Sequence, residues 1–230
     1  MAKSPQLVGA IAKVVRKPDE TVRVALRRLH EAGLIEVTGR GRGGKDMTAR
    51  DAAMLLLAMS TGTLLKDTPA TIQEYWNLPL RQVDSAVPEA PGSTPGGRIP
   101  ALAARYFAKL FTKKLAPVDT LGTVLTTIID LAAQGTLFPI AERSDFAVPR
   151  DPGRSGPSRP PLSQLRIRIY APQRAASINL DINMQWRSEH HFGVSSDETG
   201  ARNYRLAEAD YLEIRQFSHA AIAIIGESLR

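Results

Sequence analysis

Four residues in one short stretch of the sequence carry side chains suited to reading DNA: Thr21, Arg23, Arg27 and Arg28. A guanidinium group makes paired hydrogen bonds to the edge of guanine, and small side chains with a methyl group contact the methyl of thymine. Arg23 is therefore the candidate for a guanine contact, and Thr21 or Val24 is the candidate for a thymine contact.

More cations flank this stretch on both sides. Arg16 and Lys17 come directly before it, where contacts to phosphate are expected. A glycine-rich loop, residues 39–45, follows it and carries three further cations that suit the DNA backbone or the minor groove. The full predicted DNA-binding set is Arg16, Lys17, Thr21, Arg23, Val24, Arg27, Arg28, Arg40, Arg42 and Lys45.

A helix over residues 18–32 is predicted to present these side chains, because apolar residues recur there at helical spacing and Gly33 suits the end of a helix. The apolar stripe consists of Val22, Ala25, Leu26 and Leu29. The DNA-contact candidates of this helix fall on the opposite face: Thr21, Arg23, Val24, Arg27 and Arg28. Asp19 and Glu20 suit the helix dipole in the first turn. They also place negative charge near the groove, where Glu20 could accept a hydrogen bond from cytosine.

Two more helices are predicted beside this one. The first has Ser4 as its N-cap and an apolar face that extends to Val15. The second covers residues 52–59 and follows Thr48, which forms the pattern of a capping box with Asp51.

A hairpin is expected before the last of these helices, with a short strand at residues 34–38, the basic tip at 39–45 and a possible return strand at 46–47. Helix, turn, helix, hairpin and helix follow one another in the order of a winged helix-turn-helix.

The stretch from Thr21 to Val37, with Gly39-Arg40-Gly41 after it, resembles the recognition helix and wing of winged-helix transcription regulators. The GntR type is the most similar, and the MarR type shares the general plan. The resemblance covers about 45 of the 230 residues. It implies a helix in the major groove and a basic wing beside it. GntR-type domains carry a helix before this point, which is here either missing or supplied by a later segment.

The middle of the chain is predicted to be helical, with helices at residues 68–76, 99–115 and 120–133. Two segments rich in proline, glycine and serine, residues 85–97 and 143–163, are expected to be linkers.

The last part of the chain changes to a period of two. A strand from Leu165 is expected to turn at 172–174 and return over residues 178–186, which predicts a long hairpin with one wet face. The wet face consists of Asn179, Asp181, Asn183 and Gln185. A final helix is predicted at residues 206–229.

The expected fold class is α+β, with an N-terminal winged helix-turn-helix, a helical middle and a C-terminal antiparallel hairpin followed by a helix. The predicted units are residues 1–62 for DNA binding, 63–142 for a helical linker or dimerisation region, 143–163 for a linker and 164–230 for an α+β domain. The middle and final helices either form a dimer or complete a monomeric core.

The net charge of +7 is concentrated in the first 50 residues, where 11 basic and 5 acidic side chains leave +6. A basic patch of this kind favours a polyanionic partner. The absence of cysteine excludes disulfides and thiolate chemistry. The chain has neither an apolar run long enough to cross a membrane nor an apolar stretch of the kind found in secretory signals, so a cytoplasmic location is expected.

No catalytic or cofactor site is predicted. The spacing from Gly39 to Lys45 matches a phosphate-binding loop, but Asp46 stands where Ser or Thr would hold Mg²⁺. The Glu189-His190-His191 run, even with His219 or Asp181, matches no known metal pattern. His30 and Glu31 are expected to form a surface pair.

The sequence therefore predicts a sequence-specific protein for double-stranded DNA, a repressor-like transcriptional regulator that acts as a homodimer without enzymatic activity. One alternative is a DNA-handling component of a phage or mobile element, such as a packaging or replication-initiation subunit. The other is a winged helix that binds protein and never contacts DNA. Nothing in the sequence identifies an effector.

Overall fold

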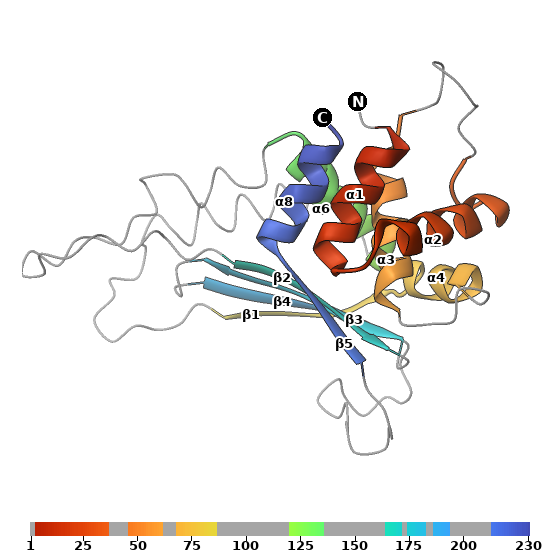
Figure 1. Cartoon of the computed structure of the whole chain (residues 1–230). Coiled ribbons are helices and arrows are strands. Elements are labelled where there is room, and N and C mark those ends of the chain that lie inside the picture. Colours follow the sequence, from red (N-terminus) through yellow and green to blue (C-terminus); the bar gives the residue numbers. More distant parts are fainter. Residues whose placement is uncertain are drawn as a thin grey trace, which may run out of the picture.

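The computed structural model describes residues 3–36, 46–61, 68–86, 120–135, 164–171, 174–182, 186–193 and 213–230. In this part of the chain, helices lie on one face of an antiparallel sheet (Figure 1). The helices are α1 (Ser4–Val15), α2 (Asp19–Glu31), α3 (Ala49–Ser60), α4 (Thr68–Trp76), α6 (Leu121–Ala133) and α8 (His219–Ser228). The strands are β1 (Leu80–Ala86), β2 (Gln164–Ala171), β3 (Ala175–Ile182), β4 (Trp186–Gly193) and β5 (Glu213–Ser218). The expected α+β class is confirmed.

Local signals determine where the N-terminal helices begin. The backbone N–H of Thr48 donates to Asp51 Oδ2 at 2.9 Å, and the backbone N–H of Asp51 donates to Thr48 Oγ1 at 3.2 Å. This is the predicted capping box, and it starts α3 at Ala49. In α1 the N-cap is Lys3, one residue before the expected Ser4, and its backbone N–H donates to the side chain of Gln6.

The helices form one packed layer. α1 contacts α2, α3 and α8, whereas α6 contacts α3 and α8. The last helix of the chain therefore packs beside the first (Figure 1). α8 approaches α6 closely at Gly226, where a Cβ would lie 2.6 Å from Ala132 Cβ.

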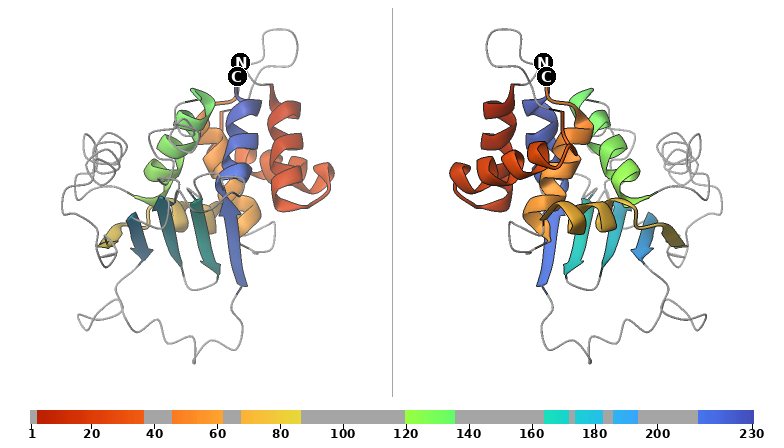
Figure 2. Two further views of the ribbon diagram at one scale, coloured as in Figure 1. Left: turned by 90° about the vertical axis from the view of Figure 1, so that its left-hand side faces the viewer. Right: turned by 90° about the vertical axis from the view of Figure 1, so that its right-hand side faces the viewer.

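The five strands run in the order β1-β4-β3-β2-β5. Ile167 is paired with Ile178 on one side and Phe217 on the other, and all three are buried beneath the helices. None of the described helices lies on the opposite face of the sheet (Figure 2).

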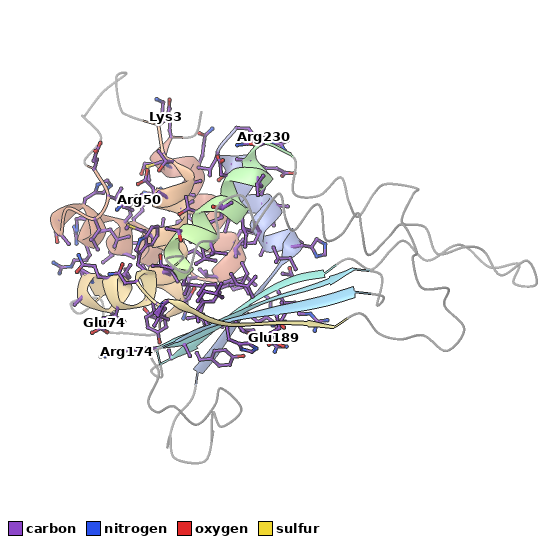
Figure 3. The ribbon with its side chains drawn as sticks, turned by 180° about the vertical axis from the view of Figure 1, so that it is seen from behind. Lys3, Arg50, Glu74, Arg174, Glu189 and Arg230 are labelled. Carbon is purple, nitrogen blue, oxygen red and sulfur yellow. The ribbon has the colours of Figure 1, made fainter. Side chains whose placement is uncertain are left out.

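α4 is attached to the end of the β2–β3 hairpin. Glu74 Oε2 lies 3.0 Å from Arg174 Nε, and the Tyr75 hydroxyl donates to the backbone oxygen of Tyr170 at 2.7 Å. Glu74 and Arg174 lie together at this end of the sheet in Figure 3.

Two predictions in the C-terminal part and one in the middle of the chain were wrong. The strand expected at 178–186 is divided, because β3 ends at Ile182 and β4 begins with its partner Trp186. The helix expected at 206–229 begins only at His219, because residues 213–218 pair with β2 as strand β5. The linker expected at 85–97 overlaps the last two residues of β1. Residues 183–185, 206–212 and 87–97 lie outside the described ones, as does the helix expected at 99–115.

Asn179 does not lie on a wet face, contrary to expectation. It is only 5% exposed, because its strand runs between β2 and β4 and its neighbours across the sheet are the longer Arg166 and Glu189. The side chain of Asp181 and residues 183 and 185 are not among those described.

One hydrophobic core runs through the described elements, from Leu7 in α1 to Ile225 in α8. The predicted units 1–62, 63–142 and 164–230 all contribute to it. α6 and α8 contribute Leu125, Ile129 and Ile225 to this core, whereas the expected dimer stays a prediction. No helix within the described ranges is both long and apolar enough to span a membrane.

Candidate nucleic-acid interface

The predicted apolar stripe of α2 is buried. Its four residues, Val22, Ala25, Leu26 and Leu29, are at most 5% exposed, and α2 packs on α1, α3 and α4. This packing holds the helix firmly and leaves its other face to solvent. Arg23, Arg27 and Arg28 are exposed on that face, and Thr21 and Val24 are half-buried beside them.

Two of the three arginines on α2 are engaged within the helix. Glu31 Oε2 lies 2.9 Å from Arg28 Nη1, and Glu31 Oε1 lies 3.7 Å from Arg27 Nε. Exposed ion pairs of this kind are weak, on the order of 0.3–0.5 kcal/mol at helical spacing. The two guanidinium groups can therefore exchange Glu31 for a stronger anionic partner.

Arg16, Lys17 and Arg23 are exposed and form no ion pair with any residue that the structure describes. Arg16 ends α1 in the left-handed conformation, with φ 54° and ψ 47°, and its backbone N–H donates to the carbonyl of Ala12. The turn between α1 and α2 therefore holds two cations directly before Arg23 and its helix.

The wing is the part of the prediction that the described residues do not reach. Residues 37–45, with Arg40, Arg42 and Lys45, lie outside them. Residues 34–36 are not a strand, contrary to expectation, and Ile35 is buried in the core. Met47 forms a single bridge position next to the start of α3.

His30 contacts a backbone oxygen, and His191 lies near a carboxylate. His30 does not pair with Glu31 as expected: its Nδ1 lies 3.2 Å from the backbone oxygen of Ile35, and Glu31 faces the arginines. His191 Nε2 lies 3.9 Å from Glu189 Oε1. His190 is paired with Ile178 across β4 and β3. Across the described residues, no three side chains form a candidate metal site.

A cavity of about 380 Å³ between α1, β5 and α8 is a feature that the sequence did not predict. Arg16 and Arg215 line it together. Arg215 was missed because residues 213–218 were expected to be helical, so that nothing in the sequence placed it beside the end of α1.

Comparison with known proteins gives no relative. No protein-family model, no curated protein sequence and no solved structure matches this chain. The functional argument therefore depends on the residues and their geometry.

Proposed function

We propose that this chain binds double-stranded DNA in a sequence-specific manner through α2 and regulates transcription as a repressor. The observation that carries the proposal is the exposed row of Arg16, Lys17 and Arg23, which has no described counter-ion. Arg16 and Lys17 lie in the turn before α2, and Arg23 lies on α2 itself, whose opposite face is buried in the core.

An α-helix fits the major groove of B-DNA, and the side chains near its N-terminus reach the base edges. In this arrangement Arg23 hydrogen-bonds guanine, and Thr21 or Val24 contacts a thymine methyl. Arg16 and Lys17 meet phosphate from the turn before the helix. Arg40, Arg42 and Lys45, which lie outside the described residues, are proposed as further contacts to the DNA backbone.

We propose that the protein acts as a homodimer, because a single short helix buries little surface and paired half-sites raise affinity. The buried faces of α6 and α8 are used inside the chain, so in this proposal the dimer forms through other surfaces. In this proposal the chain has no enzymatic activity and needs no cofactor.

The experiment is selection of bound fragments from random DNA, followed by titration of the selected sequence over a range of salt concentrations and sizing of the complex. The proposal expects a dimer on a pseudo-palindrome and an affinity that falls steeply with salt. Neutralising any one phosphate contact, such as Lys17, should lower the slope of log K against log salt by about 0.9.

Other outcomes overturn the proposal in distinct ways. Higher-order oligomers on several adjacent sites would favour a DNA-handling component of a phage or mobile element. A lack of salt-sensitive binding to any fragment would leave a module that binds protein. Lys13→Gln is the matched control, since it removes an exposed charge from α1 outside the proposed contact set.

A further inference from the structure

The cavity of about 380 Å³ lies where the end of α1 meets the junction of β5 and α8. Val14, Val15 and Met59 form apolar parts of its wall, together with Phe217. Its volume is within the range of sites for small organic molecules, which bury an apolar body and fix it with a few polar groups.

Two of the four polar residues of this wall are cationic, and the other two are Gln216 and Ser218. Arg16 and Arg215 line the cavity from two different elements, and none of the residues that line it is acidic. Arg16 is exposed and therefore marks the solvent side. Arg215 is half-buried, and its Nε is shielded from solvent.

The position of Arg215 is unusual for an arginine. It is paired with Ile169 across β5 and β2, which places it on the sheet face that the helices cover. The N-terminus of α8, with Ser218 as its N-cap, adds partial positive charge to the same wall.

We propose that this cavity binds a small organic anion, with its carboxylate or phosphate between Arg16 and Arg215 and its apolar body against Val15, Met59 and Phe217. The guanidinium groups supply charge-assisted hydrogen bonds, which are the strong class of polar contact. The apolar wall favours organic over inorganic anions, because only a ligand with a hydrocarbon group gains binding free energy from burial against it.

A second consequence rests on the proposed DNA-binding function. Arg16 belongs both to the wall of the cavity and to the row of cations before α2, so an anion in the cavity neutralises a charge that phosphate would use. The bound anion therefore weakens DNA binding, and by linkage DNA weakens the binding of the anion by the same factor.

The test uses the full chain and three named anions: benzoate, hexanoate and phenyl phosphate. Calorimetric titration should detect binding of at least one of them, and the neutral benzamide should bind more weakly than benzoate. Arg215→Gln should weaken the binding of that anion about tenfold or more, because a charged hydrogen bond is lost. Lys13→Gln, which removes a charge from α1 outside the cavity, should leave the affinity nearly unchanged.

Met59→Trp provides a second variant that keeps all charges and fills the cavity, and it should abolish binding. Circular dichroism checks that each variant is folded. The proposal is overturned if none of the three anions binds, if benzamide binds as well as benzoate, or if folded Arg215→Gln and Met59→Trp both bind as the wild type does. Wild-type binding in both variants would mean that Arg215 does not bind an anion. Its inward charge would then serve only to protect the edge strand β5 from pairing with another chain.

The DNA arm repeats the titration of the selected DNA with a saturating amount of the anion, and with an equal concentration of sodium chloride as the control. The anion should weaken DNA binding of the wild type more than chloride does, and Arg16→Gln should remove the difference. An equal effect of anion and chloride overturns the coupling. If no DNA binds at all, the proposed function fails, whereas the anion titration still decides the cavity.

Discussion

The hydroxyl of Tyr75 donates a hydrogen bond to the backbone oxygen of Tyr170 at 2.7 Å, which joins α4 to β2 over a separation of 95 positions. Tyr75 is 1% exposed. Its ring lies in the core while its hydroxyl satisfies a carbonyl of the sheet. One buried side chain thus connects the helical layer to the C-terminal hairpin.

Tyr75→Phe should therefore lower the free energy of unfolding by about 1–2 kcal/mol at neutral pH, because the carbonyl of Tyr170 loses its donor. Chemical denaturation of both proteins measures the difference. Tyr170→Phe is the comparison variant, since its half-buried hydroxyl makes only a 3.3 Å contact with Ser177 Oγ. A smaller loss in Tyr75→Phe than in Tyr170→Phe would contradict the role given to Tyr75.

The same residue predicts how stability depends on alkaline pH. Burial raises the pKa of Tyr75 above its ordinary value of 10.0, although the backbone and charge of Arg174 oppose the rise. Below pH 10 both the folded and the unfolded chain keep this proton. As the pH rises above 10, the unfolded chain releases it first, so the free energy of unfolding falls toward the folded pKa. Denaturation from pH 8 to 11 should show a steeper alkaline loss in the wild type than in Tyr75→Phe.

The contact between α6 and α8 predicts a steric effect at Gly226. A Cβ there would lie 2.6 Å from Ala132 Cβ and 2.7 Å from the backbone of Ala132 and Ala133. Since helix backbones cannot yield cheaply, Gly226→Ala should lower the free energy of unfolding by about 1–3 kcal/mol. Gly9→Ala in α1 meets nothing within 4 Å and should instead raise it by up to about 1 kcal/mol. Equal effects of the two substitutions would show that the helices are not this close.

Short-range signals explain what the sequence could predict. The capping box of Thr48 and Asp51 has both partners within one turn, and the stripe of α2 repeats within 13 residues, so both could be found locally. The ion pairs of Glu31 with Arg27 and Arg28 have helical spacing as well. The sequence therefore carries their signal, because both arginines lie within one helical turn of Glu31.

Strand β5 carries no comparable local signal. Its apolar residues fit a helical period, and it becomes a strand only because Phe217 and its neighbours pair with β2 far earlier in the chain. The cavity depends on this pairing, since Arg215 reaches the end of α1 only from a strand at the sheet edge. Pairing between distant segments is what local periodicity cannot predict.

Arg16 combines a backbone cost with a proposed contact. A residue other than glycine in the left-handed conformation is disfavoured by about 1 kcal/mol. Arg16→Gly should therefore raise the free energy of unfolding by up to about 1 kcal/mol while it weakens DNA binding. Arg16→Gln separates the two effects, because it removes the charge and keeps the strained backbone. If Arg16→Gly binds DNA as tightly as the wild type, Arg16 is not a DNA contact.

Arg23 is the candidate for reading a base, and Arg23→Ala tests it. The substitution should cost about 1–3 kcal/mol on the preferred sequence and relax selectivity at one position. Anisotropy titrations with the preferred and a scrambled duplex measure both effects. An equal loss on the two duplexes would reduce Arg23 to a phosphate contact.

Removing the charge of Glu31 is expected to tighten DNA binding. A gain of this kind cannot result from a variant that is merely damaged or unfolded. The carboxylate of Glu31 holds Arg28 at 2.9 Å and Arg27 at 3.7 Å on the exposed side of α2. Glu31→Gln removes a negative charge that repels phosphate and frees both guanidinium groups, so it should tighten DNA binding and steepen its salt dependence. Glu227→Gln, an exposed acid on α8, makes the same change in net charge outside the proposed interface. If both variants tighten binding equally, net charge alone explains the gain, and α2 is not the surface that meets DNA.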